Sequence, residues 1–362
     1  MSPQLKRTLF VVGSFVLGGG LLYLALRGVD FGAVGDALRT AEYGWLVPLV
    51  GVTLLSHYFR AWRWQMLLEA LPEEERAARP SIREAFYALM IGYMVNYAAP
   101  RLGEVVRAAN FASRSRMRMP GVFGTVVVER VLDVVTLGIA LVSVGLLYGA
   151  RLAGVLGVFG GGVRDVVGGL PPFPLPLLIM GGGLLAAAGL LALRWLLRRG
   201  GRVGSAARNF GAGLASVLRS RRRVGIVLTS IATWLCYGLM AYFPLRMLGI
   251  AQAYGLGLVD AWALMNVGAI GIALPSPGGT GSFHYVTIQT LVHLFGVDAA
   301  PAATYALLTH AAQLVFFCLG GFISLLLQGT SLGALRRTAA TAEREAEEIA
   351  EDVAVDVRPS EA

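Results

Sequence analysis

The chain has 362 residues, of which 56% are hydrophobic and only 15% are charged. A soluble domain averages about 45–50% apolar and about 25% charged residues, so this composition argues against a soluble enzyme, a nucleic-acid-binding protein and a disordered chain. The formal net charge is +9, which in a membrane protein usually reflects basic cytoplasmic loops. Both cysteines, Cys236 and Cys318, lie in apolar runs and predict neither a disulfide framework nor a metal site.

Six segments are apolar and long enough to cross a bilayer core, which takes about 20 residues. We expect the first to be a retained span rather than a signal peptide, because no small-residue cleavage site follows it. The predicted spans are residues 8–26, 44–62, 120–148, 171–197, 224–245 and 302–328.

Two further segments, residues 84–113 and 257–297, have the pattern of a helix, a break and a second helix. A proline removes a helix hydrogen bond and disfavours helical geometry before it. In lipid, such a break is tolerated only inside protein or along a wet cavity. The predicted helix breaks contain Pro100 and Gly103 in the first segment, and Pro275, Pro277, Gly278, Gly279 and Gly281 in the second.

The basic residues indicate whether these broken segments cross the membrane or turn back. If both crossed, Arg114, Arg116, Arg118 and the nine arginines of residues 194–223 would lie outside. That contradicts the tendency of basic loops to be cytoplasmic. We therefore expect two re-entrant hairpins in a protein of the cell inner (cytoplasmic) membrane, with the N- and C-termini in the cytoplasm.

This topology divides the chain into two halves that repeat each other upside down. Residues 8–148 and 171–328 each run span, span, hairpin, span, from opposite sides, as in many secondary transporters. The predicted fold class is an all-α polytopic membrane protein with about six transmembrane helices and two opposed re-entrant helical hairpins. The membrane domain covers residues 1–328, with a basic interfacial segment at 198–223 and a soluble Ala/Glu-rich tail at 329–362.

Charged residues collect near the first break and at the start of the span that follows it. They are three acids, Glu104, Glu129 and Asp133, and three arginines, Arg101, Arg107 and Arg130. A charge in the centre of a membrane helix costs about 2.5–3.5 kcal/mol, so it is retained when it pairs or serves a site. We expect the arginines to bind a lipid phosphate and the acids to orient them or take protons. The alternative is a set of internal salt bridges that locks the hairpin to the span.

The second break predicts a different chemistry. Its glycines expose backbone N–H groups, and the helix after Gly281 points its positive end at the break, which suits an anion or a polar headgroup. A tight break without a ligand explains the same sequence. His284 is a candidate polar or proton-binding side chain, although a buried histidine with satisfied hydrogen bonds is the commoner case. No catalytic residue, metal site or cofactor is expected, because no nucleophile–base or metal-ligand spacing occurs.

Two tryptophans and two arginines follow one another at the end of the second span. We interpret Arg60, Trp62, Arg63 and Trp64 as an aromatic and basic belt at the membrane interface.

Three stretches resemble the lysylphosphatidylglycerol synthase transmembrane-region family of flippase-like proteins. They are NYAAPRLGEVVR from Asn96, VVVERVLDVVTL around Glu129, and LPSPGGTGSF in the second break. The resemblance covers roughly residues 5–328. Position by position, it marks all the break residues named above. It also marks five charged residues: Glu104, Arg107, Glu129, Arg130 and Asp133. The family commonly has a glutamate just after the glycine-rich break, where this chain has His284.

The resemblance implies translocation of a lipid or a lipid-linked intermediate between leaflets. Bifunctional members add a soluble aminoacyl transferase domain, which this sequence has no room for, so we expect no enzyme activity. The predicted substrate is a phospholipid or a polyprenyl-phosphate type lipid. The alternative is a non-transporting membrane partner of a lipid- or glycan-modifying enzyme. Expected partners are anionic lipid headgroups at the basic cytoplasmic loops, and either a separate transferase or further copies of the chain, but no nucleic acid.

Overall fold

The computed structural model describes residues 3–72, 79–98, 102–167, 222–274, 276–331 and 333. Within these ranges every regular element is a helix and none is a strand. The predicted all-α class is therefore confirmed. Several residues and segments for which the sequence makes predictions lie outside the described residues: Pro100, Arg101, Pro275, the predicted span 171–197, most of the basic segment 198–223 and most of the tail.

The described residues of the first half form six α-helices and one short 3-10 helix. These are α1 (Pro3–Leu26), α2 (Phe31–Arg39), η1 (Tyr43–Trp45), α3 (Leu46–Glu69), α4 (Ile82–Ala98), α5 (Leu102–Ser115) and α6 (Met119–Val167). α3 continues past the predicted end of its span, and α6 continues well beyond residue 148. Residues 149–167 contain no proline, so nothing in that sequence forces the helix to end.

The described part of the second half begins with a long helix and ends with another. Its elements are α9 (Arg223–Met247), α10 (Ile250–Ala253), α11 (Leu258–Ala273), the 3-10 helix η3 (Pro277–Gly279), α12 (Ser282–Phe295) and α13 (Ala299–Leu327).

Three described helices are long and apolar enough to cross a membrane: Met119–Gly149 of α6, α9 and α13. Val12–Leu26 and Phe31–Arg39, bent by 81° at the break between them, would count as a fourth span if taken together. α3 falls outside this set, and its second half carries Arg60 and Arg63. The predicted number of six spans therefore stays a prediction.

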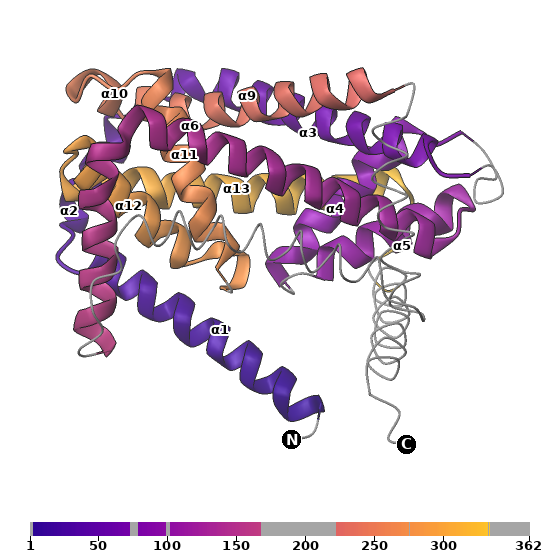
Figure 1. Cartoon of the computed structure of the whole chain (residues 1–362), viewed down its shortest axis with the longest axis horizontal. Helices are drawn as coiled ribbons and strands as arrows, with labels where there is room; N and C mark the ends of the chain where they lie inside the picture. Colours follow the sequence, from indigo (N-terminus) through magenta and orange to yellow (C-terminus); the bar gives the residue numbers. More distant parts are fainter. Residues whose placement is uncertain are drawn as a thin grey trace.

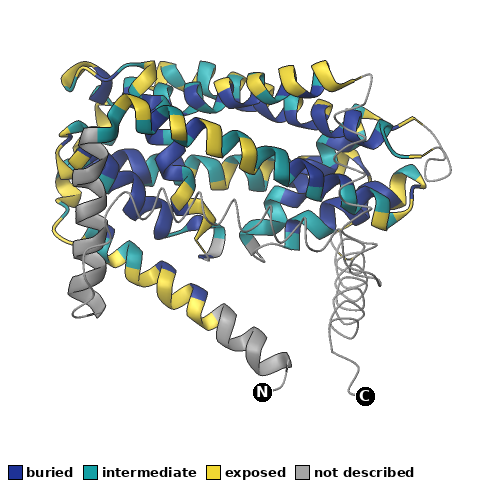
Figure 2. Cartoon of the chain, viewed as in Figure 1, coloured by how far each residue is buried: buried dark blue, intermediate teal, exposed yellow. Residues whose placement is uncertain are grey.

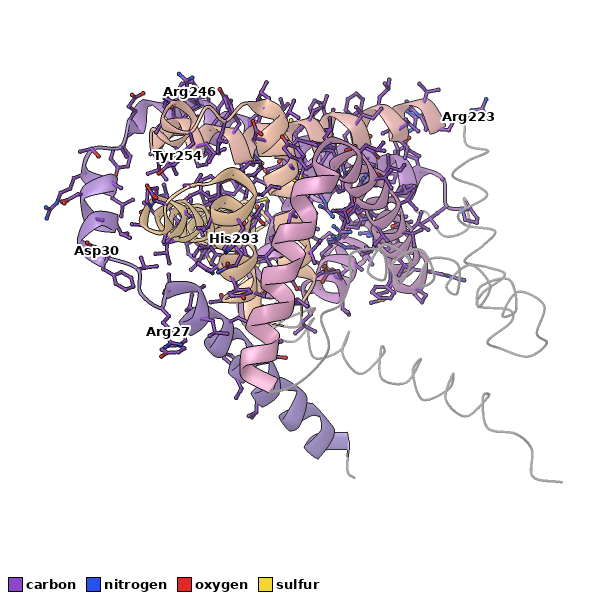
Figure 3. All side chains as sticks on the ribbon, turned by 60° about the vertical axis from the view of Figure 1, so that its left-hand side comes forward. Arg27, Asp30, Arg223, Arg246, Tyr254 and His293 are labelled. Carbon is purple, nitrogen blue, oxygen red and sulfur yellow. The ribbon has the colours of Figure 1, made fainter. Side chains whose placement is uncertain are left out.

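The outer faces of the long helices are apolar. On α6, Ile139, Val142 and Leu146 are exposed, as are Val224, Val227 and Leu228 on α9, and Figure 2 shows exposed residues along the outside of both helices. Apolar faces of this extent are expected where lipid is the solvent. Figure 3 shows Arg223 and Arg246 at opposite ends of α9, where a membrane span meets its two aqueous interfaces.

Two helical hairpins lie on opposite sides of the centre of the molecule (Figure 1). α4 packs against α5, and α11 packs against α12. Each hairpin has its own apolar core: one combines α3, α4, α5 and the start of α6, and the other combines α9 to α13 with the end of α1. The end of α1 belongs to the predicted first half but packs in the core of the second hairpin. The division into two inverted halves therefore stays a prediction.

The two halves are interlocked by long helix contacts. α3 packs along α9, and α13 packs along α4. At the end of the first hairpin that is away from its break, Gln328 donates to Glu84 (Nε2 to Oε2, 2.9 Å) and Arg114 donates to the same oxygen (2.8 Å). Asn110 also bonds Gln328 (3.2 Å), so the ends of α4, α5 and α13 are tied together. The other end of α4 contacts the turn of the second hairpin, because the ring of Tyr97 lies against Gly278.

Candidate anion site at the first hairpin

Arginines and acids from three helices form one buried ion-pair cluster. Its centre is Glu129 on α6, whose side chain is 0% exposed. Arg60 on α3 donates to Glu129 Oε1 from Nε (2.9 Å) and from Nη2 (2.7 Å). Arg107 on α5 donates to the other oxygen, Oε2, from Nη2 (2.8 Å). The cluster therefore joins α3, α5 and α6 through a single carboxylate.

Asp133, one helical turn after Glu129, completes the cluster. It accepts hydrogen bonds from Arg60 Nη2 (2.8 Å) and Arg63 Nη2 (2.6 Å). The two arginines also reach α9, where Arg60 donates to the Tyr237 hydroxyl (2.9 Å) and Arg63 to the Ser230 hydroxyl (3.2 Å). These contacts fix the positions of Glu129 and Asp133. They also make the buried charges tolerable, because a buried charge is stable only when it is paired and hydrogen-bonded.

Arg107 keeps donor capacity that the protein does not use. Its side chain is 2% exposed, and its guanidinium lies 4.6 Å from the ring centre of Trp64. Among the described residues, only Nη2 has a hydrogen-bond partner, whereas Nε and Nη1 are buried without one. An unpaired buried donor costs about 1–3 kcal/mol, so this arrangement is unfavourable unless a ligand accepts those hydrogen bonds.

The unused donors belong to a residue that lines a small recess. The recess is lined by Leu89, Gly92, Tyr93 and Asn96 from α4, by Gly103, Glu104 and Arg107 from α5, and by Arg130 from α6. In this conformation it is too narrow for a water molecule. Arg130 Nη2 pairs with Glu104 Oε1 at 3.0 Å, and Asn96 Nδ2 donates to Glu104 Oε2 at 3.3 Å. Glu104 therefore links Asn96 of α4 to Arg130 of α6 within the lining of the recess.

Gly103 permits the close packing of the first hairpin. It lies inside α5 rather than in the break, so its prediction as a helix-breaking residue is corrected. A side chain on Gly103 would collide with the carbonyl oxygen of Gly92 and with Asn96, 2.6 Å from Oδ1. Its backbone N–H donates to Asn96 Oδ1 at 2.8 Å. Glycine is needed here for the approach of two helix backbones, which brings Glu104 and Arg107 to the recess.

The second hairpin is interrupted between Ala273 and Ser282. Gly278, Gly279 and Gly281 have φ values of 58°, 76° and 85°, which favour glycine, and η3 includes Pro277. Gly281 also lies against the backbone of Gly18 on α1. Together these features make a tight turn covered by the first helix.

The backbone donors of this turn are partly used inside the hairpin. Gly279 N–H donates to Ser276 O (3.1 Å), and Gly281 N–H donates to His284 Nδ1 (3.3 Å). The expectation that the glycines offer free N–H groups to a ligand is therefore corrected for these two positions.

His284 lies in a small polar group beside the turn. Its ring centre lies 4.7 Å from that of His310, and His310 Nε2 lies 3.2 Å from the Thr280 hydroxyl. His284 is buried, and its Nδ1 is occupied by the Gly281 N–H. It is thus a hydrogen-bonded interior histidine of the second hairpin, and it is not among the residues that line the recess.

A family model described as the lysylphosphatidylglycerol synthase TM region matches residues 11–321. The chain belongs to this family. The match includes both hairpins and every residue of the ion-pair cluster. Together with the apolar helices, it shows that this member of the lysylphosphatidylglycerol synthase TM-region family is a multi-pass membrane protein.

A curated relative of this family member is the protein named Glycosyltransferase AglD from Haloferax volcanii. The two are 27% identical over 372 residues, which cover 95% of this chain and 59% of the relative. The chain therefore spans about three fifths of the length of that relative. No solved structure matches the chain.

The structure of this family member corrects the sequence-based interpretation of two arginines. Arg60 and Arg63 were interpreted as a membrane-interface belt, yet their side chains are 7% and 0% exposed and bind Glu129 and Asp133. Trp64 is buried under Arg107, and only Trp62 of the four is exposed. The spacing of His57, Arg60 and Trp64, which puts them on one helix face, was the signal that could have shown a buried polar face.

Proposed function

We propose that the chain is a flippase-like membrane protein. It binds the phosphate of a phospholipid or of a polyprenyl-phosphate type lipid and moves that lipid between leaflets. The observation that carries the proposal is Arg107, a buried guanidinium that lines a recess and has two nitrogens without a partner. A guanidinium binds phosphate oxygens in a two-pronged geometry, which suits these unused donors.

The remaining residues of the cluster have supporting roles in this proposal. Glu129 and Asp133 hold Arg60, Arg63 and Arg107 in place from one side. Arg130 faces the recess from α6 and is 38% exposed, so it is the arginine that an arriving headgroup meets first. Internal ion pairing and phosphate binding are compatible, because the pairs leave Arg107 Nε and Nη1 unused.

The contact between the end of α4 and the second break supports a transport path. Asn96 lines the recess, and the next residue, Tyr97, lies against Gly278 in the second break. Broken helices that meet near the membrane centre surround the substrate sites of many secondary transporters. We place the protein in the cytoplasmic membrane, with both termini and the basic loops on the cytoplasmic side, near anionic headgroups.

A second function is favoured by one comparison. The relative is named a glycosyltransferase, and this chain matches only 59% of its length. The chain would then be a non-transporting membrane partner of a lipid- or glycan-modifying enzyme. It would bind a separate transferase or further copies of itself. In both proposals the chain itself is not an enzyme and holds no cofactor.

Leaflet exchange in proteoliposomes tests the first function. Purified protein is reconstituted with fluorescent phospholipids or a fluorescent polyprenyl phosphate, and the fraction that becomes accessible to an impermeant quencher is followed. We expect exchange above that of empty vesicles for at least one lipid class, and its loss in Arg107→Gln. Arg39→Gln removes an exposed arginine of α2 and should keep full exchange. Exchange equal to empty vesicles for both classes would reject the flippase, and co-purification with a transferase would then favour the partner role.

A further inference from the structure

Glu104 closes the recess by binding the groups that a ligand would need. One of its carboxylate oxygens lies 3.0 Å from Arg130 Nη2, and the other accepts a hydrogen bond from Asn96 Nδ2 at 3.3 Å. All three residues line the recess beside Arg107. The recess is too narrow for water in this state, and the Glu104 carboxylate already binds two of the groups that line it.

Among the acids of the cluster, Glu104 is the one that is free to move. Its side chain is 27% exposed and, among the described residues, pairs with one arginine, whereas Glu129 is 0% exposed and pairs with three. Glu104 also lies in the first turn of α5, next to the break of the hairpin. The positive end of a helix stabilises an acidic side chain there, and it stabilises a bound phosphate equally well.

The charge of the cluster changes when Glu104 leaves. Among the described residues it contains four guanidinium groups, of Arg60, Arg63, Arg107 and Arg130, and three carboxylates, of Glu104, Glu129 and Asp133. Counted over these seven described side chains, the closed state has one net positive charge. Displacement of Glu104 leaves two net positive charges among the same described residues.

From this charge we infer that Glu104 occupies the place of the ligand's anion and that the ligand is a phosphate monoester, carried by a lipid or free. A phosphate monoester carries about −1.5 to −2 charges at pH 7, which matches the opened recess. A phosphodiester headgroup carries one negative charge and leaves one positive charge unmatched. This inference rests on the proposed function, because it takes the recess to be the site that binds the phosphate of the transported lipid.

A binding experiment separates this inference from transport itself. The full-length protein in phosphatidylcholine nanodiscs is titrated with short-chain phosphatidic acid, a monoester, with short-chain phosphatidylglycerol, a diester, and with inorganic phosphate. We expect tighter binding of phosphatidic acid than of phosphatidylglycerol. Glu104→Gln removes the competing charge and should tighten phosphatidic acid binding about five-fold, the size expected for one partly exposed ion pair.

Glu84→Gln is the matched control. Glu84 is a partly exposed carboxylate of the same hairpin, paired with Arg114 at 2.8 Å, and it does not line the recess. This variant should bind phosphatidic acid as the wild type does. Glu104→Ala should show the same tightening as Glu104→Gln, and thermal unfolding in detergent shows that each variant is folded.

Each outcome decides a separate point. Equal affinity of phosphatidic acid and phosphatidylglycerol overturns the monoester assignment, and unchanged or weaker binding in both folded Glu104 variants overturns the displacement. If inorganic phosphate competes with phosphatidic acid, the site recognises the phosphate group alone. If phosphatidic acid binds tightly and inorganic phosphate does not compete, the ligand is a lipid-borne monoester. If no probe binds, the inference fails, and the proposed function survives only if leaflet exchange is still observed.

Discussion

Arg60 on α3 and Glu129 on α6 are 69 positions apart in the chain, and the guanidinium donates twice to one carboxylate oxygen, at 2.9 and 2.7 Å. Neither side chain is more than 7% exposed. The pair fixes the orientation of α3 against α6, and Glu129 extends the same link to Arg107 and the hairpin. The ion pairs thus hold the recess in shape and leave Arg107 with spare donors.

Glu129→Gln should destabilise the protein strongly. The variant keeps the shape of the side chain but removes the negative charge that Arg60 and Arg107 share. Loss of one partner of a buried ion pair costs about 3–5 kcal/mol, because the remaining charge is left uncompensated. Thermal unfolding in detergent checks this. Glu42→Gln, a change at an exposed acid near η1, is the control and should leave the thermal midpoint unchanged. A thermal midpoint for Glu129→Gln equal to that of the wild type would show that this charge does not stabilise the cluster.

Gly103→Ala should disrupt the first hairpin. The added methyl group collides with Gly92 O and Asn96, so α4 and α5 must separate, at a cost of about 1–3 kcal/mol. Gly124→Ala on α6 is the matched control, since a methyl group there meets nothing within 4 Å. Gly103→Ala alone should lower the thermal midpoint and the affinity for phosphatidic acid. Equal values for Gly103→Ala and Gly124→Ala would contradict the packing described for Gly103.

His57→Phe should be tolerated. His57 is buried among Tyr93, Phe316 and Phe317, and neither of its ring nitrogens has a hydrogen-bond partner. Replacing an unpaired buried polar group with an apolar ring of similar shape is nearly neutral or stabilising, by about 1 kcal/mol. His284→Phe is the comparison, because it removes the acceptor of the Gly281 N–H and should lower the thermal midpoint. A clear loss of stability in His57→Phe would contradict the assignment of His57 as an unpaired core residue.

Cysteine labelling tests the predicted topology. Arg116→Cys, between α5 and α6, should react with an impermeant maleimide only from the cytoplasmic side, and Arg39→Cys, at the end of α2, only from outside. Figure 1 shows α2 and the end of α5 at opposite ends of the molecule. The native Cys236 and Cys318 are first replaced by serine. Labelling of position 116 from outside would overturn the orientation of both hairpins.

Much of the fold was predictable because hydropathy and proline are local signals. The long apolar segments appear as α1, α3, α6, α9 and α13, and the second break lies at the predicted Pro/Gly sequence. The ends of helices were less predictable. α6 continues to Val167 because no residue after 148 stops it, and the local pattern does not show where lipid ends.

The site was predictable in part. Arg107, Glu129 and Asp133 were candidates because isolated charges in apolar segments are costly, and the structure brings them together. Arg60 and Arg63 were misassigned because basic and aromatic residues at a segment end have the composition of an interface belt. Their burial depends on the packing of α3 against α6 and α9, which is tertiary information. Gly103 was misassigned because its role depends on Gly92 in the facing helix.

The most direct test of the central claim is an experimental structure of the full-length protein in nanodiscs that contain short-chain phosphatidic acid. We predict density for a phosphate group within hydrogen-bond distance of Arg107 Nη1 and of Arg130, with the Glu104 carboxylate turned away from Arg130. A phosphate bound elsewhere, with the Glu104–Arg130 pair still closed at about its present 3.0 Å, would contradict the assignment of the recess as the anion site.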